Sequence, residues 1–374
     1  MNYHRPKDYY IWQKADWPNF TWDSTLVNTL LNSVKKRQGE LFGMLSVLGL
    51  DVKKRASLEA MSSSLIHSSL IEGEILSADS VRSSLAVRLG VTYPQPKIPD
   101  HYVEGIVQAN VDAMQNYSQP LTTERLFGWH AAMFPTGYSG SQKIMVADWR
   151  KGESPMLVIS GAIGHEKIHY EAPPSDIVPK EMERYLDWVN NASTDNILKA
   201  AIAHLWFVAI HPFDDGNGRL ARIVTDMLMC RSDGEPERYY SVTTEILKHR
   251  KEYYETLNKT TCGELDITQW LIWFLHRVNE GISNSEKTLS SVMEKHRFWN
   301  NVQNIEINER QRKVLNKLMS DFEGNLTSSK WAKIAHCSPD TALRDIQDLI
   351  AKGILNKSGE GGRSTHYIIT WSKT

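Results

Sequence analysis

The chain has 374 residues, of which 41% are hydrophobic and 23% are charged, and its formal net charge is -1 at pH 7. This length predicts two or three domains, and the balanced charge argues against a general polyanion-binding protein while leaving a local basic patch open. No apolar run approaches the length of a membrane span, which argues against a membrane protein.

The compartment is predicted from the N-terminus and from the cysteines. The segment Met1–Pro6 lacks the apolar core of a signal peptide. The three cysteines, Cys230, Cys262 and Cys337, are odd in number and widely separated, so they predict neither disulfides nor a structural zinc site. We therefore expect a cytoplasmic protein.

Residues 9–23 are dense in aromatic side chains. They could form a ligand surface, but aromatic residues more often pack a terminal arm onto a core, and we favour packing. Asp23 or Ser24 is a suitable N-cap for a helix that runs to about Leu48. A second helical pattern covers roughly Asp51 to Leu70.

The second helix ends in a short polar pattern. Ser68 and Glu72 are four residues apart and share one helical face, and Gly73 is a typical stop just after a helix. Taken alone, this pattern indicates nothing more than a helix terminus.

The next part of the chain alternates between helices and a short β segment. A proline-rich joint, Pro94 to Pro99, leads into two expected helices, His101 to Gln115 and Thr122 to Phe134. Two β-rich runs then flank a glycine-containing loop over about residues 156–172 and predict a hairpin. In a helical protein such a hairpin is most often only a connection.

Residues 211–222 form a loop between two expected helices. Ile197 to Ile210 is almost wholly apolar, which is typical of a buried helix. Pro212 and the run Gly216 to Gly218 interrupt the helical pattern. Apolar residues then recur with helical spacing on one face of a second helix, at Leu220, Ile223, Val224, Met227 and Leu228.

This loop combines groups that suit phosphate chemistry. Glycines at a helix N-terminus let backbone N–H groups approach an anion. Arg219 and Arg222 project from one side of the first turn and can hold phosphate oxygens, and Asp215 can ligate Mg²⁺. His211 suits proton transfer near neutral pH. Each residue alone has a plain structural explanation, but together, within twelve residues, they predict phosphate-group transfer.

The segment His211 to Arg222 resembles the signature of the Fic (filamentation induced by cAMP) family, His-x-Phe-x-(Asp/Glu)-Gly-Asn-Gly-Arg-x-x-Arg, at every defined position. The resemblance implies a helical core that transfers AMP from ATP to a hydroxyl of a target protein. It implies His211 as the base that deprotonates the hydroxyl, Asp215 as the Mg²⁺ ligand and Phe213 as an anchor in the core. The implied nucleotide-binding residues of the loop are Gly216, Asn217, Gly218, Arg219, Leu220, Ala221 and Arg222.

The same resemblance gives other segments a role. Ser68, Glu72 and Gly73 match the family's inhibitory motif, which implies that Glu72 occupies the guanidinium of Arg222 and keeps the γ-phosphate of ATP from binding productively. The hairpin resembles the family's flap, which aligns the target by strand addition, and implies nucleotide-site contacts from four residues: Val158, Ile159, Ser160 and Gly161. The region after the signature implies a base pocket at Tyr253, Tyr254 and Thr261.

The remaining residues predict a separate small domain. A helix from Ile267 to Val278 closes the core, and a second, polar helix towards His296 acts as a connector. Three helices (308–319, 328–335 and 339–352) and a hairpin (354–357 and 365–369) resemble a winged helix–turn–helix domain. Its expected recognition helix carries Asp340, Asp345 and Asp348, so we favour docking or dimerisation over DNA binding.

The sequence thus predicts a mainly α protein with two small hairpins and four segments: an N-terminal helical domain (1–95), a Fic core (96–285), a connector (286–304) and a winged-helix domain (305–374). The predicted function is an autoinhibited protein adenylyltransferase that uses ATP and Mg²⁺ and modifies Ser, Thr or Tyr of a target or of itself, with a homodimer left open. The alternatives are a nucleotide-sensing DNA-binding regulator, a reverse, AMP-removing activity, or another nucleotide donor.

Overall fold

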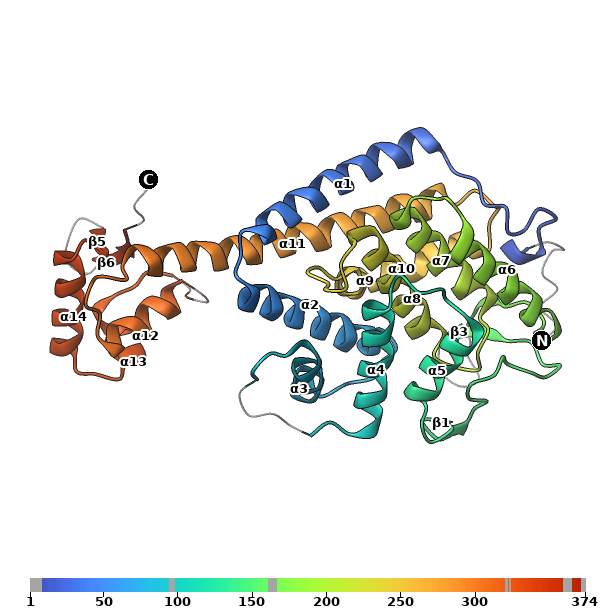
Figure 1. Ribbon diagram of the computed structural model, residues 1–374, viewed down its shortest axis with the longest axis horizontal. Helices are drawn as coiled ribbons and strands as arrows, with labels where there is room; N and C mark the ends of the chain where they lie inside the picture. The colour runs from blue at the N-terminus through green and yellow to red at the C-terminus, as the bar shows by residue number, and fades with distance from the viewer. Residues whose placement is uncertain are drawn as a thin grey trace. The chain divides into compact units, whose positions relative to one another are not determined.

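The computed structural model describes residues 9–93, 98–160, 167–319, 322, 324–358 and 365–370. The chain divides into two compact units, Met1–Glu286 and Lys287–Thr374. The fold is mainly helical, as predicted (Figure 1). Among the described residues, no helix combines the length and the apolar character needed to cross a membrane.

The first unit is built from helices. Their bounds are α1 Ser24–Ser46, α2 Leu50–Ile71, α3 Ala78–Leu89, α4 His101–Gln115, α5 Thr123–Met133, α6 Val178–Asn191, α7 Asn196–Ile210, α8 Asn217–Asp233, α9 Val242–Lys248 and α10 Arg250–Thr261, with short 3₁₀ turns at Ile11–Gln13 and Ser175–Ile177. Helix α11, Thr268–Asn301, begins in the first unit and ends in the second. The sequence pattern did not predict α3 or α6.

Helix α11 corrects one prediction. It is continuous across the residues where we expected one helix to end near Val278 and another to begin. Gly281 lies inside it and does not stop it. A Cβ at Gly281 would come within 3.2 Å of the carbonyl oxygen of Ser241, so this glycine allows the chain before α9 to approach the helix closely.

The core of the first unit surrounds α7. Almost every residue of α7 is buried, because its apolar side chains face neighbours all round. It packs on α6 and on α8, and α4 packs on both α5 and α8 (Figure 1). Gly105 of α4 lies directly against the carbonyl of Ala132 in α5, which a larger residue would prevent.

The aromatic N-terminal arm packs onto this core. The rings of Trp17 and Phe20 lie 6.1 and 5.8 Å from that of Trp206 in α7, with edge-to-face geometry. The indole Nε1 of Trp17 donates a hydrogen bond of 2.7 Å to Glu181 in α6. The arm is therefore part of the fold of the first unit, as the packing alternative predicts.

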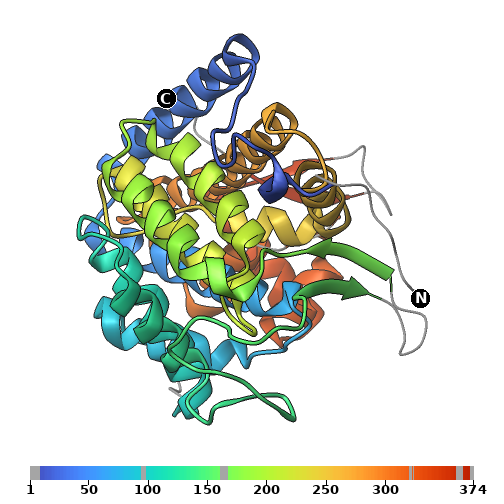
Figure 2. The ribbon, with the colours of Figure 1, turned by 90° about the vertical axis from the view of Figure 1, so that its right-hand side faces the viewer.

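Two hairpins interrupt the helices of the first unit. Strands β3 Leu157–Ser160 and β4 Lys167–Glu171 pair antiparallel, with a bulge between Val158 and Ile159, and they project from the helices (Figure 2). A smaller hairpin precedes it, and the sequence did not predict this one. Its strands, β1 Tyr138–Ser139 and β2 Gln142–Lys143, have two residues each. The hydroxyl of Tyr170 in β4 donates a hydrogen bond of 2.8 Å to the carbonyl of Ala209, which ties the larger hairpin to the end of α7.

The second unit contains three short helices and a hairpin, at bounds close to those predicted. They are α12 Glu309–Leu318, α13 Ser328–Ala335, α14 Pro339–Ala351, β5 Leu355–Ser358 and β6 His366–Ile369. The hairpin is antiparallel, and a further bridge joins Leu326 to Tyr367. Trp331 is fully buried at the centre of an apolar core that includes Val314, Leu315 and Ile346.

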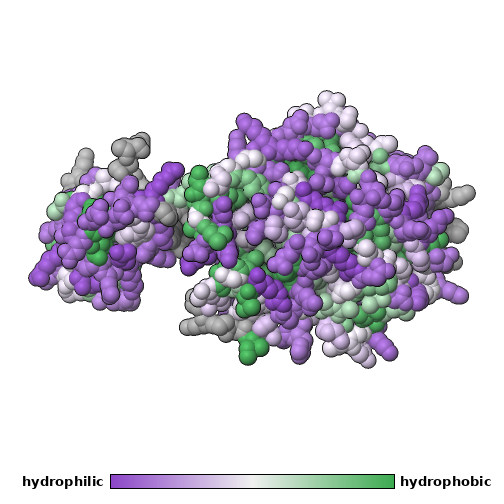
Figure 3. All heavy atoms as spheres, in the orientation of Figure 1, coloured by the Kyte–Doolittle hydropathy of each residue, from purple (hydrophilic) through white to green (hydrophobic). Residues whose placement is uncertain are grey.

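The face drawn in Figure 3 is mostly hydrophilic, and hydrophobic residues lie over several parts of it, including the junction of α1 and α2. Figure 3 shows hydrophobic residues gathered over this junction, where Val47 and Leu50 are 72% and 67% exposed. Both residues lie at the turn between two helices, away from the buried faces that hold α1 and α2 in the unit.

Candidate active site

The loop between α7 and α8 is fixed at both ends by its own backbone. Helix α7 ends at His211, which adopts the left-handed conformation (φ 53°) and donates its N–H to Phe207 at 2.9 Å. Pro212 cannot continue the helix. Helix α8 begins after Gly216, whose φ of 82° suits glycine, and a Cβ there would come within 2.8 Å of the Phe134 ring.

Side chains inside the loop hold its shape. Asn217 spans the loop: its Oδ1 accepts from the N–H of Phe213 at 2.9 Å, and its Nδ2 donates to the Phe213 carbonyl at 2.8 Å. Phe213 is fully buried and stacks on His130 with ring centroids 4.2 Å apart. The first N–H groups of α8, which have no acceptor within the helix, are therefore presented by a rigid loop.

His211 faces a cavity and is held as a neutral imidazole. Its Nδ1 lies 3.3 Å from the carbonyl oxygen of Val208, which suits an N–H donor there and leaves Nε2 as the basic nitrogen. Burial lowers the pKa of His211 to about 4, and the positive charge of Arg150 adds to this effect. At neutral pH the imidazole is thus unprotonated and available as a base.

Arg150 is a supporting residue that the sequence did not indicate. It is 4% exposed, and its Nε donates a hydrogen bond of 2.7 Å to the backbone carbonyl of His211. Its Nη2 also donates to the carbonyls of Pro173 and Ile210, and its backbone N–H donates to Pro212 at 2.9 Å. The guanidinium and the backbone N–H of Arg150 together therefore hold the chain from Ile210 to Pro212.

Arg222 is held by the end of α2. It is 2% exposed, and its Nε donates to the hydroxyl of Ser68 at 2.8 Å, while its Nη2 donates to the Ser68 carbonyl at 3.0 Å and to Oε1 of Glu72 at 2.7 Å. A methyl group at Gly218 would collide with Oε1 of Glu72. The Glu72 carboxylate therefore lies directly over the first turn of α8.

Arg219 is held by a different carboxylate. Its Nη1 donates hydrogen bonds of 2.7 Å both to Oε2 of Glu74 and to the hydroxyl oxygen of Tyr102, and Tyr102 in turn donates to Glu74. The Arg219 guanidinium also lies over the Phe134 ring, 4.9 Å from its centroid. Both signature arginines thus meet carboxylates from residues 72–74.

Each of these arginines retains a buried N–H group without a hydrogen-bond partner among the described residues, Nη1 on Arg222 and Nε on Arg219. Buried donors are almost always paired in folded proteins. An anion at the start of α8 would satisfy such donors and also the free N–H groups of the helix.

Asp215 suits a magnesium ion. Its Oδ1 accepts from the N–H of Gly216 at 2.5 Å, and its Oδ2 accepts from the hydroxyl of Ser139 and lies 3.9 Å from Nη2 of Arg219. Protein-bound Mg²⁺ is commonly held by one or two carboxylates together with phosphate oxygens and water. A single, partly exposed carboxylate next to an anion-binding helix start fits that donor set.

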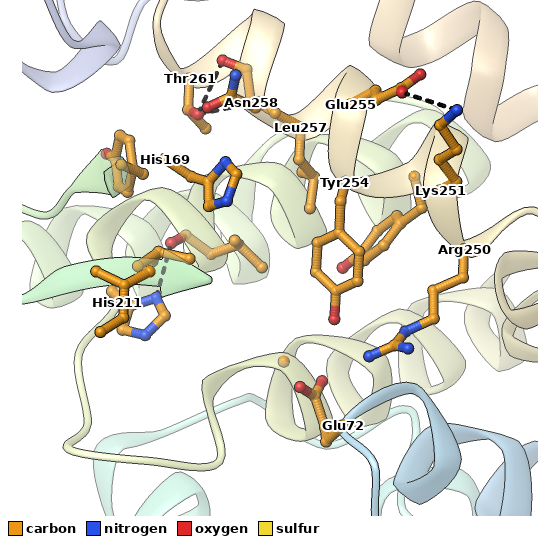
Figure 4. Close-up of a pocket in the computed structure, with 16 residues that line it drawn as sticks. Glu72, His169, His211, Arg250, Lys251, Tyr254, Glu255, Leu257, Asn258 and Thr261 are labelled. Atoms are coloured by element: carbon orange, nitrogen blue, oxygen red, sulfur yellow. Dashed lines mark hydrogen bonds and ion pairs between the residues drawn. The ribbon is translucent and has the colours of Figure 1, made fainter. Parts of the chain in front are cut away.

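A cavity of about 800 Å³ is lined by His211, Gly218 and Glu72, while Asp215, Arg219 and Arg222 are not among its lining residues. Figure 4 shows His211 at one side of it, Glu72 at the base and Tyr254 and Arg250 of α10 opposite. Val158 and Ile159 of the hairpin also line the cavity, and Ile159 is 52% exposed. The cavity therefore runs from the start of α8, between β3 and α10.

Not every residue that the sequence marked faces this cavity. Leu220 and Ala221 are fully buried in the core. Tyr253 lines the cavity but is only 2% exposed, and its hydroxyl lies 2.9 Å from Nε2 of His204; Tyr254 is 40% exposed. Thr261 also lines it, with its hydroxyl bonded to the carbonyl of Leu257 at 2.9 Å. Gly161 lies outside the described residues, as does the side chain of Ser160.

The sequence did not indicate several residues around this site. Besides Arg150, they are Glu74, Tyr102, Ser139, His204, Arg250 and Lys251. Glu74 stands two residues after Glu72 and could have been noticed, but its partner Arg219 is 145 residues away. Each of these residues reaches the site through a contact between distant segments, which leaves no periodic pattern in the sequence.

The fold and the site define a class: a helical protein with an anion-binding helix start, a carboxylate beside it and a neutral histidine facing the same cavity. Comparison with known proteins shows similarity to known families in two segments. Residues 120–229 match the Fic/DOC family, and residues 10–91 match a domain of unknown function, DUF4172. Neither match extends over half of the chain, so each describes its own segment.

Three curated relatives are similar in sequence to parts of this chain. The protein adenylyltransferase fic-1 of Caenorhabditis elegans is 41% identical over 93 residues, which are 24% of this chain and 17% of the relative. The protein adenylyltransferase Fic of Nematostella vectensis is 26% identical over 251 residues, 63% of this chain and 51% of the relative. A uridine 5'-monophosphate transferase of Xanthomonas campestris is 26% identical over 120 residues, 30% of this chain and 21% of the relative. The chain thus spans about half or less of each.

The fold is also similar to that of solved structures. A Fic family protein from Desulfovibrio desulfuricans G20 superposes with a TM-score of 0.54 at 19% identity, covering 94% of this chain and 98% of the other. At this identity the likeness concerns the fold alone.

Proposed function

We propose that this chain is a protein nucleotidyltransferase that moves AMP from ATP to a hydroxyl group of a protein, and that Glu72 holds it inactive. The observation that carries the proposal is the single cavity that both His211 and Gly218 line, since it brings a base and an anion-binding helix start together. The adenylyltransferase names of two relatives support the choice of reaction.

The phosphates of the nucleotide would bind at the start of α8. The N–H groups of Asn217, Gly218 and Arg219 and the guanidinium of Arg219 would receive the α- and β-phosphates, and Arg222 would receive the γ-phosphate. Asp215 would hold Mg²⁺, which when bound neutralises phosphate charge. The adenosine would extend towards Tyr254 and Thr261, where the cavity is lined by α10.

The transfer step follows from the position of His211. Nε2 of His211 takes the proton from the target hydroxyl as its oxygen attacks the α-phosphorus. The bond from that phosphorus to the oxygen bridging the β-phosphate breaks, and pyrophosphate leaves. Arg150 keeps the imidazole in position by holding the backbone on both sides of it. Strand addition of the target along β3 or β4 would present its hydroxyl in line.

Inhibition follows from the contact between Glu72 and Arg222. Their ion pair of 2.7 Å occupies the group that the γ-phosphate needs, and Oε1 of Glu72 covers the backbone at Gly218. A carboxylate and a phosphate compete for the same guanidinium. The glutamate must therefore move before ATP can bind productively.

The test is transfer of label from α-labelled ATP in a cell lysate and in the purified protein. We expect Glu72→Gly to raise labelling of a target or of the chain itself by about ten- to a hundredfold, in the range of typical coupling between two sites. Glu72→Gly combined with His211→Ala should abolish it. If Glu72→Gly leaves labelling unchanged while ATP binds, the inhibitory assignment is wrong.

The donor is tested in the same experiment. One relative is a uridine 5'-monophosphate transferase, so α-labelled UTP is the appropriate competitor. We expect ATP to be preferred, and a larger signal from UTP would change the donor but keep the role of His211. Labelled target incubated with the unsubstituted protein tests the reverse, AMP-removing activity.

For the second unit we propose a winged helix–turn–helix that docks a protein surface. Three helices and an antiparallel hairpin support this assignment. The acidic residues that argued against DNA are partly neutralised inside the unit, because Asp345 is buried against Arg310 and Asp348 contacts Lys352. Leu343 is 41% exposed on α14 and suits a protein partner better than phosphate. Salt-dependent retention of duplex DNA, lost on Arg344→Ala, would support the DNA alternative.

A further inference from the structure

The two carboxylates that flank Gly73 contact the two signature arginines in different ways. Gly73 has a φ of 87°, and its N–H and that of Glu74 bond back to the carbonyls of Leu70 and Ser69 at 3.0 Å each. This Schellman arrangement fixes the backbone on both sides of the glycine. Glu72 and Glu74 are therefore held in place by the same helix ending.

Glu72 lies on the side of Arg222 that the ligand needs. Its carboxylate lies over Gly218 and lines the cavity. Glu74 does not line the cavity. Instead its Oε2 accepts hydrogen bonds from Nη1 of Arg219 and from the hydroxyl of Tyr102. Nη2 of Arg219 lies 3.9 Å from Oδ2 of Asp215.

Arg219 is thus fixed at one end and directed at the site with the other. The Phe134 ring supports the face of the guanidinium, and the closed triangle of Glu74, Tyr102 and Arg219 fixes its rotation. The Nε of Arg219, which is buried and without a partner among the described residues, is left for an acceptor at the start of α8.

We propose that Glu74 and Tyr102 are positioning residues that orient Arg219 towards the phosphates of the nucleotide, whereas Glu72 two residues earlier blocks Arg222. The same turn therefore contains one carboxylate that opposes nucleotide binding and one that supports it. This inference rests on the proposed assignment of Arg219 to phosphate. It adds that release of inhibition must move Glu72 while leaving Glu74 on Arg219.

The experiment measures nucleotide affinity without turnover. In the Glu72→Gly, His211→Ala protein, calorimetry with ATP and Mg²⁺ is compared with calorimetry with adenosine, which carries no phosphate. We expect Glu74→Gln and Tyr102→Phe each to weaken ATP binding by about tenfold, as loss of a hydrogen bond to a charged group does. Adenosine binding should stay within about twofold, since the base pocket of α10 does not contact either residue.

Tyr117→Phe is the control, because the Tyr117 hydroxyl donates a hydrogen bond of 2.9 Å to the carbonyl of Gly234, away from the site. It should change neither affinity. Tyr102→Phe keeps the ring and guards against a folding defect in Glu74→Gln. The proposal would be overturned if the affinities for ATP and adenosine fell equally or if neither affinity changed. Tighter ATP binding in Glu74→Gln would also overturn it, because Glu74 would then be a second inhibitory residue.

A failure of this proposal can be distinguished from a failure of the proposed function. The affinities are measured in a protein that cannot transfer AMP, so the orientation of Arg219 is tested even if labelling by Glu72→Gly fails. In the active Glu72→Gly protein we expect Glu74→Gln to raise KM for ATP about tenfold, with a smaller effect on kcat. Absence of ATP binding in the parent protein would instead remove the phosphate assignment of Arg219 and the proposal with it.

Discussion

The start of α8 and the contact between α12 and α14 both bury charged side chains, and the hydrogen bonds of these side chains are satisfied differently. At α8, Arg219 and Arg222 are 4% and 2% exposed, and each keeps a buried N–H without a partner among the described residues. At α14, both oxygens of the buried Asp345 accept from Arg310 at 3.0 Å, and Oδ1 also accepts from Asn308 at 3.1 Å.

The difference supports the role proposed for the arginines at the start of α8. A buried charge with all its hydrogen bonds made within the chain needs nothing more, and it fixes how α12 and α14 pack. A buried guanidinium with a donor left over, next to a cavity, is arranged for an acceptor that arrives from outside. Four changes test this contrast, and they run from the largest expected effect to the smallest.

The core of the second unit should matter for stability alone. Trp331 is fully buried there, and Trp331→Ala should cost about 3–5 kcal/mol of its unfolding free energy, as large-to-small core changes do. Denaturant unfolding followed by fluorescence measures the loss, and labelling by the Glu72→Gly protein should persist. Ile368→Ala, at a 50% exposed position, is the control and should cost less than about 0.5 kcal/mol. Parallel loss of labelling would contradict the independence of the two regions.

Arg150 should matter for the reaction through His211. Arg150→Met removes two hydrogen bonds to the backbone at His211 and Ile210 and a third to Pro173, and a small displacement of a reacting group costs about a hundredfold in rate. We therefore expect labelling by the Glu72→Gly protein to fall by about a hundredfold. The adjacent Lys151→Met, whose side chain is 64% exposed, should leave it unchanged. Full activity in Arg150→Met would show that the loop keeps its shape without the guanidinium.

Acid should weaken the first unit before the second. Burial lowers the pKa of His204 to about 3 and that of His130 to about 4, below the value of about 6.5 in the unfolded chain. Between these values the unfolded state binds more protons, so stability falls as the pH drops from about 6.5 towards 4. Each histidine should contribute about 1–2 kcal/mol of loss at pH 5.

Urea unfolding at pH 7 and pH 5 measures this loss, and His204→Gln should reduce it. In residues 297–370, where described, no histidine is buried, so the second unit should show a smaller change over this range. Labelling should also stay level from pH 8 to 6, because the pKa of His211 is about 4. A profile that rises with pH through 6.5 would contradict a neutral, buried base.

Replacement of Ser139 should have the smallest effect, and this effect should be limited to the Mg²⁺ requirement of the reaction. Its hydroxyl donates to Oδ2 of Asp215, and loss of a group that orients a metal ligand typically weakens metal binding by about tenfold or more. We expect Ser139→Ala to raise the Mg²⁺ concentration needed for half-maximal labelling by about tenfold. Ser141→Ala, at an exposed position two residues away, is the control. An unchanged Mg²⁺ requirement would argue against Asp215 as the ligand.

The sequence alone determined much of the helical framework and the content of the loop. Helices such as α4 and α13 occur where apolar residues recur with helical spacing, and the loop from His211 to Arg222 lies between two such helices. These features depend on residues close together in the chain, whose pattern follows from backbone geometry. The Gly73 stop after α2 is local in the same way.

Only the tertiary structure decided which residues surround the site. Glu74 meets Arg219 across 145 residues, and Arg150 reaches the carbonyl of His211 across 61. Packing also determines three other features. It buries His211 and so lowers its pKa, it places the hydroxyl of Tyr253 against His204, and it lets α11 continue across Gly281. Contacts between distant segments follow from how the faces of helices fit together, and no spacing along the chain records that fit.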